Sequence, residues 1–436
     1  MLVSRKVTGV HQLPASVSTA LTDGRIDWTL LQMAAGNGAP AADAVILLRS
    51  TDVAAFGDLV RAAGFVELPG ARGSSRCYAA LERAAARFLS LRVTSRIDLG
   101  RNGEFRTAFA AGVLERSVRT PEGFVPSPED GFWLLLLRCL LEDGGILPEH
   151  RGSLLAGVRG ARVDSEIPRV LDGVLRPAGI GAVALRTWAA TEEWAELARA
   201  AEPLRNGWHR TSPPRRWPSR RDFGRERRGN RLSPGRRGLS VAVLGPDGAG
   251  KSTLAEGIER TFPVPVVKVY MGLWKSGDDA RTVAQLREIA ARPFRAWFRF
   301  ASAKAHQFRG RLVVFDRYVY DARLPPSPPA VTAKRIYFWF LSRACPPPDL
   351  ALLLDLPGAV SYARKGENSV EENEAARQGF LALRDELRLH VLDATRSSEE
   401  VLGDALEVIW AACLARWGES ATADLAAPSE RVVPAR

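Results

Sequence analysis

Short apolar runs alternate with stretches of helical periodicity through the second half of the chain. Short runs of this kind are typical of strands that are buried on both faces of a parallel sheet. Five of them are present, at Leu239–Leu244, Pro265–Tyr270, Leu312–Phe315, Asp349–Leu354 and His390–Leu392. Helices are expected between and after them, at 282–311 with a break near Pro293, at 375–389 and at 398–416. The alternation predicts an α/β domain with a doubly wound parallel sheet.

The first half of the chain carries a more mixed pattern. Apolar residues predict a strand at Asp43–Arg49 and a helix at Val53–Ala63, then strands at 65–68, 78–80 and 88–97. Helices are expected further on, at 128–141, 151–155 and 182–201. A group of strands followed by a group of helices predicts an α+β domain, which we place at residues 1–202.

A segment of different composition, residues 203–238, joins these two regions. It is rich in arginine, proline and glycine and has almost no aliphatic side chains. It therefore cannot bury enough apolar surface to offset the entropy lost on ordering. We expect a disordered linker at 203–238, the α/β domain at 239–418 and a disordered tail at 419–436.

The chain has a net charge of +12, and most of this charge lies in one place. Between Arg205 and Arg237 there are twelve arginines and two acids, which gives +10 and leaves +2 for the rest of the chain. One interpretation is a basic arm that binds nucleic acid, anionic lipid or another polyanion. A solvated tether is favoured, because few aromatic residues interrupt the arginines.

The remaining composition is that of a folded protein in a reducing compartment. The four cysteines are far apart and form no C-x-x-C pair, which argues against a zinc site and against a disulfide framework. The start of the chain lacks an apolar stretch of signal-peptide length. The longest apolar run, Gly131–Leu141, is too short to span a bilayer. We expect a cytoplasmic protein without a transmembrane segment.

The clearest chemical signal is the stretch Gly245–Thr253, which has the sequence G-P-D-G-A-G-K-S-T. It fits the phosphate-loop pattern G-x-x-x-x-G-K-[ST] and lies between an apolar run and a helix that carries Leu254 and Ile258. Glycines allow the backbone to turn tightly and to aim its N–H groups at phosphate oxygens. Lys251 then contacts the β- and γ-phosphates, and the Ser252 hydroxyl joins the Mg²⁺ ligands. The stretch predicts nucleotide binding.

Four separate phrases resemble the thymidylate kinase family of nucleoside monophosphate kinases. They are G-P-D-G-A-G-K-S-T, V-V-F-D-R-Y, P-D-L-A-L-L-L-D-L-P, and R-K-G-E followed by a helix and D-A-T. The resemblance covers about 180 residues, from 240 to 416. It implies a P-loop kinase fold, ATP and Mg²⁺ as cofactors, and direct transfer of the γ-phosphoryl group.

The resemblance also implies roles for individual residues. Asp316 and Ser252 serve the metal, and Arg317 resembles the arginine at the junction of the donor and acceptor phosphates. Arg364 and Lys365 lie where the family has a mobile lid with catalytic cations, within a charged segment at 362–374. Thr395 and Arg396 resemble the loop beside the adenine. The donor phosphates are expected on Gly245, Asp247, Gly248, Ala249, Gly250, Lys251, Ser252 and Thr253.

The acceptor side departs from the family pattern. Y-M-G-L-W at 270–274 has no arginine where the family carries one for the acceptor phosphate, and Pro325–Pro329 is a proline-rich insert. Tyr320 and Asp321 replace the usual small residues, and Asp247 or Asp321 is able to accept a proton from a hydroxyl. The small-molecule acceptor therefore remains open between a nucleoside monophosphate and a sugar-type hydroxyl compound.

Two other functions are compatible with the same sequence. One is an ATPase that binds nucleic acid or another polyanion through the basic linker. The other is a non-catalytic ATP-binding scaffold. The kinase is preferred, because a protein that only binds ATP has less need of Arg317, Arg364 and Lys365. A homodimer is left open.

The N-terminal region resembles, more faintly, the nucleotidyltransferase-like superfamily. The resemblance rests on the mixed order of strands and helices and on the phrase A-A-G-F at 62–65. Active members hold a metal with paired acids on the first strand. Here Asp43 stands at the first position and Val45 at the second, with Asp98 as a candidate third acid. A lone carboxylate is a poor Mg²⁺ site, so we expect a degenerate, non-catalytic domain.

The expected helix at 282–311 contains a basic and aromatic stretch, Phe294–Phe308. A helix of this composition is able to lie on a membrane or to face an anionic acceptor. The preferred interpretation is a helix with one face in the core and solvated charges on the other.

Overall fold

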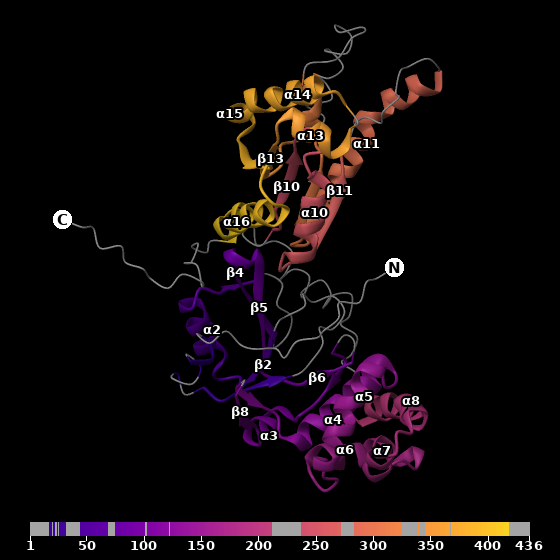
Figure 1. Ribbon diagram of the computed structural model, residues 1–436. Coiled ribbons are helices and arrows are strands. Elements are labelled where there is room, and N and C mark those ends of the chain that lie inside the picture. Colours follow the sequence, from indigo (N-terminus) through magenta and orange to yellow (C-terminus); the bar gives the residue numbers. More distant parts are fainter. Residues whose placement is uncertain are drawn as a thin grey trace, which may run out of the picture. The chain divides into compact units, whose positions relative to one another are not determined.

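The computed structural model describes residues 17–19, 21, 24, 26–31, 44–68, 75–100, 103–121, 123–211, 237–271, 283–324, 339, 345–366 and 368–417. They fall into two compact units (Figure 1). The first unit lies within Met1–Ala80 and Leu89–Arg227, and the second within Leu81–Phe88 and Arg228–Arg436. Among the described residues no helix is both long and apolar enough to cross a membrane.

A mixed five-stranded sheet organises the first unit. Its strands are β1 (Trp28–Leu31), β2 (Ala44–Leu48), β3 (Val66–Glu67), β4 (Ser75–Glu82) and β5 (Arg87–Thr94). They lie in the order β1-β2-β5-β4-β3, with β1 antiparallel to β2 and β2 parallel to β5. The helix α2 (Val53–Ala62) follows β2 and buries Phe56 and Val60. The strands β2 to β5 and the helix α2 occupy the positions expected from the apolar pattern, whereas no strand was expected at β1.

The remaining elements of the first unit form a helical layer, which Figure 1 shows around α4 to α8. The helices are α3 (Ala110–Glu115), α4 (Pro128–Arg138), α5 (Pro148–Gly157), α6 (Glu166–Leu175), α7 (Ala182–Ala190) and α8 (Trp194–Thr211). Two short hairpins accompany them, β6 (Asp98–Leu99) with β7 (Phe105–Arg106) and β8 (Val118–Thr120) with β9 (Gly123–Val125).

The central helix α4 shows why this sequence forms a helix. Pro128 occupies its first turn, and the Ser127 hydroxyl accepts a hydrogen bond from the Asp130 N–H at 3.2 Å. Trp133 and Leu137 of this helix are fully buried in the core of the unit. The buried Asp130 carboxylate is paired with the Arg116 guanidinium at 3.0 Å, so the start of α4 is tied to the end of α3.

The boundary of the first unit differs from the expectation. The helix α8 continues to Thr211, so residues 203–211 are helical and the linker expected at 203–238 begins too early. The physical reason is that Leu204 and Trp208 are buried in the helical core despite their polar neighbours. The expected single helix at 182–201 is two helices, with Glu192 in the left-handed region at φ 61° between them. Residues 212–236 and 418–436 lie outside the described residues.

The second unit is built on a five-stranded parallel sheet. Its strands are β10 (Ser240–Leu244), β11 (Val266–Tyr270), β12 (Leu312–Asp316), β13 (Leu350–Asp355) and β14 (Leu389–Asp393), in the order β11-β12-β10-β13-β14. All four pairings are parallel. The strand order reverses direction at β10, which is the arrangement of a doubly wound fold. The expected α/β class and parallel sheet are confirmed.

Helices follow each strand of this sheet. They are α10 (Lys251–Thr261), α11 (Val283–Phe308), α13 (Gly358–Lys365), α14 (Val370–Ala382), α15 (Arg384–Leu387) and α16 (Ser398–Trp417), with a short 3₁₀ turn η6 (Val319–Arg323) after β12. Phe300 of α11 and Phe380 of α14 pack in one core cluster with Ala242 and Leu244 of β10. Because side chains alternate along a strand, Val241 and Val243 point to the opposite face.

The helix α11 differs from the sequence-based expectation at Pro293 and on its exposed face. It runs through Pro293 without the expected break. Ala296, Phe300 and Ala303 face the core, as preferred for the basic aromatic stretch. The other side of the helix is not only charged, however, because Phe294 and Phe298 are 71% and 70% exposed.

The charged segment expected to form a mobile lid is largely helical. Residues 362–365 complete α13, and 370–374 begin α14, with Glu367 between them outside the described residues. The start of α14 is fixed by a capping box in which the Ser369 hydroxyl and the Glu372 carboxylate accept each other's backbone N–H. The predicted helix at 375–389 accordingly begins earlier, and it ends before β14.

Asp349, which directly precedes β13, joins four elements of the second unit. Its carboxylate accepts hydrogen bonds from the Ser240 N–H and hydroxyl at 2.8 and 2.6 Å and from the Gln307 amide, and it pairs with Arg416 at 2.6 Å. Burial alone would raise the pKa of Asp349, but the hydrogen bonds from Ser240 and Arg416 outweigh it and hold the pKa below its usual range. The ionised form therefore stabilises the fold.

We expect Asp349→Asn to lower the free energy of unfolding of the second unit by about 2 kcal/mol at pH 7, or roughly 5 °C in Tm. A group with a lowered native pKa stabilises the fold fully above its unfolded pKa and ceases to do so as the pH falls through the native value. The deficit of the variant should therefore shrink below about pH 4.

Thermal unfolding of the full chain measures this effect. The transition of the second unit is identified as the one whose Tm rises when ATP is added. Asp385→Asn changes an exposed carboxylate of α15 in the same way and serves as the matched control. An equal effect of both substitutions, or a deficit as large at pH 3 as at pH 7, would contradict the role given to Asp349.

Candidate active site

The loop between β10 and α10 has the conformation that the phosphate-loop pattern requires. Gly245, Gly248 and Gly250 adopt φ values of 143°, 88° and 92°, which side chains other than glycine rarely allow. A Cβ at Gly245 would stand 2.9 Å from the Leu354 carbonyl oxygen, and one at Gly248 would stand 2.7 Å from that of Ser361. The glycines therefore serve both the turn and the close packing of β13 and α13 against the loop.

The Lys251 side chain is the centre of this loop. It is 7% exposed, and its ammonium donates to the carbonyl oxygens of Gly245 at 2.9 Å and Pro246 at 2.7 Å. A third contact joins the ammonium to the Asp247 carboxylate at 3.4 Å. Burial and the nearby Arg317 lower the pKa of Lys251. The ammonium thus lies inside the curve of the loop, where the pattern predicts a contact with phosphate.

Ser252 and Asp316, the expected metal ligands, lie side by side. The Ser252 hydroxyl on the first turn of α10 donates to the Asp316 carboxylate at 2.8 Å. Asp316 reaches this position because it ends β12, whose register aligns it with Val243 of the neighbouring β10. A hydroxyl and a carboxylate oxygen in contact are the hard ligands that Mg²⁺ prefers, so the residues fit the ion.

Arg317 follows directly and is turned toward the loop. Its backbone is in the left-handed region at φ 66°, and its N–H donates to the Val243 carbonyl at 3.2 Å. Residues other than glycine seldom adopt the left-handed conformation, and those that do are often found at functional sites. The guanidinium is paired with the Asp247 carboxylate. The structure therefore brings Arg317, Asp247 and Lys251 into one charged cluster.

Asp247 and Asp321 supply the negative charge of this cluster. Burial would raise the pKa of Asp247, but Lys251 and Arg317 hold it below its usual range. Asp321, on the η6 turn, behaves in the opposite way. Burial raises the pKa of Asp321 to about 6, although Arg317 and Lys251 act against the rise. The two carboxylates differ in their readiness to take up a proton near neutral pH.

The two expected lid cations, Lys365 and Arg364, contact different parts of the second unit. Lys365 lies against the phosphate loop, since a Cβ at Gly248 would stand 3.4 Å from the Lys365 Cβ. The Arg364 guanidinium donates to the Ala394 carbonyl at 3.2 Å and so reaches the loop after β14. Both side chains are exposed at the end of α13.

The side chains of Thr395 and Arg396, in the loop expected beside the adenine, are bonded to neighbouring acidic residues. The Thr395 hydroxyl and N–H donate to the Asp393 carboxylate at 2.6 and 3.0 Å. Arg396 pairs with Glu400 and Asp404 of α16 at 3.0 and 2.6 Å. In the phosphate loop, Ala249 is buried and donates its N–H to the Pro246 carbonyl at 3.3 Å, whereas Thr253 is exposed on α10.

Two residues near Asp247 were missed by the sequence reasoning. The buried Ser361 of α13 donates its hydroxyl to the Asp247 carbonyl, and the Asn368 amide lies 3.3 Å from the Asp247 carboxylate. Asn368 directly follows the R-K-G-E phrase, which was a usable signal. Ser361 carries no motif, and only the packing of α13 against the loop reveals it.

Comparisons with known proteins agree with this geometry. No protein-family model matches the chain. It is 30% identical to a thymidylate kinase of Xanthomonas campestris pv. campestris over 218 residues, which is 44% of this chain and 90% of that protein. It is 27% identical to a probable thymidylate kinase of Pyrobaculum aerophilum over 188 residues, 39% of this chain and 95% of that protein.

The chain is also similar in part to a solved structure. A deoxyadenosine kinase from M. mycoides with bound dATP matches 39% of this chain and 98% of its own length, with 13% identity and a TM-score of 0.29. A likeness of this strength carries no functional argument. The thymidylate kinases carry it instead, since almost their whole length is matched. The chain belongs to the thymidylate kinase family and is an ATP-dependent kinase.

Proposed function

We propose that the chain transfers the γ-phosphoryl group of ATP to a small acceptor, in the first place a nucleoside monophosphate of the thymidylate kind. The observation that carries the proposal is the convergence of Lys251, Arg317 and the Ser252–Asp316 pair at the carboxyl ends of β10 and β12. In open α/β sheets, ligands bind at these strand ends where the strand order reverses. The match to almost the whole length of two thymidylate kinases supports the acceptor class.

The chain's own residues account for the donor half of this reaction. The loop N–H groups and the start of the α10 dipole attract the donor phosphates. Lys251 and Arg317 neutralise charge on the oxygens of the phosphoryl group, which is the main catalytic requirement of this transfer. Ser252 and Asp316 would hold Mg²⁺, which when bound would offset the negative charge of the donor phosphates. Lys365, beside the loop, adds a further cation.

A specific observation favours a second acceptor class, a hydroxyl compound such as a sugar. A hydroxyl must lose its proton as it attacks, whereas a nucleotide phosphate already offers an anionic oxygen. Asp321 lies within the charged cluster, and its pKa of about 6 suits a base near neutral pH. The Y-M-G-L-W phrase and the insert at 325–329, which distinguish the acceptor side, lie largely outside the described residues.

The remaining expectations stay predictions. The polyanion-binding ATPase depends on residues 212–236, which lie outside the described residues. The scaffold is disfavoured by the cluster of Arg317, Asp247 and Lys251, which simple ATP binding does not need. Cytoplasmic localisation and a homodimer are likewise proposals.

For the N-terminal unit we propose a domain without nucleotidyltransferase activity. Val45, at the second acid position of the resemblance, is 6% exposed within β2 and packs in the core. Asp98 is paired with Arg96 at 2.9 Å, while Asp43 lies outside the described residues. These observations support the expected loss of the metal-binding acids.

The first test measures ADP release from ATP and Mg²⁺ by the full chain with each nucleoside monophosphate, a panel of sugars, or DNA. We expect a nucleoside monophosphate to stimulate release, and Lys251→Ala to reduce it by about 10³-fold or more because the donor phosphates lose their cation. Lys268→Ala on the edge strand β11 is the matched control. Stimulation by DNA alone would favour the ATPase, and ATP binding without any turnover would favour the scaffold.

The second test concerns the shape of the Arg317 cation. We expect Arg317→Lys to lower kcat by about 10²-fold or more while the Kd for ATP changes less than tenfold, because a lysine cannot offer the planar, forked contact. Arg323→Lys, at the end of the η6 turn that follows Arg317, is the matched control because Arg323 is paired with Glu386. Equal kcat values for both variants would remove Arg317 from the proposed chemistry.

The third test separates the two acceptor classes through Asp321. With a hydroxyl acceptor, Asp321→Asn should lower kcat/KM by about 10²–10⁴-fold at pH 8, where the wild-type carboxyl is ionised. The wild-type rate should rise with pH up to about 6 and level off above it, and the difference between the two proteins should be about tenfold smaller at pH 5 than at pH 8. With a nucleoside monophosphate, the same variant should lose less than tenfold at pH 8. A uniform loss with both acceptors would assign Asp321 a positioning role only.

A further inference from the structure

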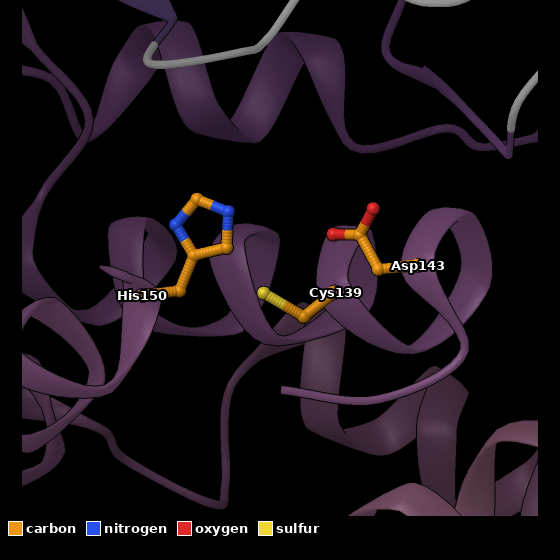
Figure 2. Close-up of side chains that lie close together, drawn as sticks. All are labelled: Cys139, Asp143 and His150. Atoms are coloured by element: carbon orange, nitrogen blue, oxygen red, sulfur yellow. The ribbon is translucent and has the colours of Figure 1, made fainter. Parts of the chain in front are cut away.

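Three potential metal ligands from two neighbouring elements meet in the helical layer of the first unit. They are the Cys139 sulfur, the Asp143 carboxylate and the His150 imidazole, whose ligand atoms all lie within 4.8 Å of one another. Figure 2 shows the sulfur between the imidazole on one side and the carboxylate on the other. We propose that these three residues form a binding site for a divalent transition-metal ion, with Zn²⁺ as the ligand that fits them best.

The local fold explains how the three side chains come together. Cys139 and Asp143 begin and end the π-helical turn η2 (Cys139–Asp143), so their four-residue spacing puts them on one side of the turn. Gly144 then adopts φ 77°, and the Gly145 N–H donates to the Cys139 carbonyl at 3.2 Å. This reversal leads directly into α5, where His150 lies in the first turn. π-helical turns are rare and occur frequently at functional sites.

The chain around the site is fixed by contacts that do not involve the three ligands' side chains. The Arg205 guanidinium of α8 donates to the carbonyl oxygens of Leu140 and Leu141 at 3.2 and 3.0 Å. These are carbonyls of the π turn itself. Arg138, which directly precedes the turn, lies 3.6 Å from the Glu142 carboxylate. The turn that carries Cys139 and Asp143 is therefore held in place independently of a metal.

The chemistry of the three side chains favours a transition-metal ion. Thiolate and imidazole are ligands of Zn²⁺ and its transition-metal neighbours, whereas Mg²⁺ and Ca²⁺ prefer oxygen alone. Bond lengths to Zn²⁺ of about 2.0–2.3 Å place tetrahedral ligand atoms about 3.3–3.7 Å apart. The three side chains thus need to close by roughly 1 Å, which rotation about their χ angles supplies. Binding replaces the thiol proton with the metal and releases that proton to solvent.

Burial indicates how the ion would sit. Cys139 is fully buried, His150 is partly exposed and Asp143 is exposed. The ion would rest at the edge of the helical core, with water able to take the fourth position. Because its ligands come from both η2 and α5, it would fasten these elements to each other. In the sequence, the three ligands follow the spacing C-x₃-D-x₆-H. A zinc site was not expected from the sequence because the chain has no C-x-x-C pair, and this spacing was not considered.

The test uses the full chain without an affinity tag, freed of metal by dialysis against a chelator. Co²⁺ replaces Zn²⁺ as a spectroscopic probe. We expect one equivalent of Co²⁺ to give a thiolate-to-cobalt charge-transfer band in the near ultraviolet together with visible bands of four-coordinate cobalt. One equivalent of Zn²⁺ should abolish these bands. Co²⁺ bound near Ser252 and Asp316 has only oxygen ligands and gives no such charge-transfer band.

Variants assign the ligands. Cys139→Ser should remove the charge-transfer band, and His150→Gln and Asp143→Asn should each weaken Co²⁺ binding at least tenfold. Cys77→Ser, which changes another thiol of the first unit, should bind Co²⁺ as the wild type does. Because Asp143 is exposed, its substitution reports on binding even if Cys139→Ser fails to fold. A wild-type chain without a saturable charge-transfer band, or an Asp143→Asn variant with unchanged affinity, overturns the proposal.

Discussion

The buried ammonium of Lys251 is the charge on which the kinase unit depends. A cation that is 7% exposed needs partners, and it finds them in two carbonyl oxygens of the phosphate loop and in Asp247. Those carbonyls point inward only because Gly245, Gly248 and Gly250 adopt positive φ values. The glycines, the lysine and the strand that precedes them therefore form one physical unit, and β12, β13 and α13 are packed around it.

The donor side of the site was predictable from the sequence because its chemistry depends on local spacing. The phosphate-loop pattern fixes the spacing of Lys251 and Ser252 within the eight residues 245–252. An apolar strand that ends at Asp316 and is followed by Arg317 predicts that these two residues meet the loop at the edge of the sheet. Ser361 was not predictable, because its contact with Asp247 arises from the packing of one helix on a loop more than a hundred residues away. A sequence motif reflects local geometry, whereas two residues that meet only through packing have no fixed spacing in the sequence by which they could be recognised.

The errors in the fold have the same origin. Residues 203–211 have the composition of a linker, yet Leu204 and Trp208 find a hydrophobic core that only the folded helices create. The charged segment at 362–374 is polar enough to be mobile, yet packing of Ser361 and the capping box at Ser369 hold it helical. Pro293 removes one backbone donor from α11 without ending it, because Ala296 and Phe300 beyond it are anchored in the core. Tertiary contacts overrode local preference in each case.

In the proposed reaction the charges of the site would couple the binding of its two ligands. Asp247 is paired with both Lys251 and Arg317 and balances their charge. A bound triphosphate would compete with Asp247 for these two cations and would add negative charge near Asp316 and Asp321. A divalent ion held by Ser252 and Asp316 would offset that charge. Each ligand would thereby lower the electrostatic cost of binding the other, which is a physical basis for binding them together.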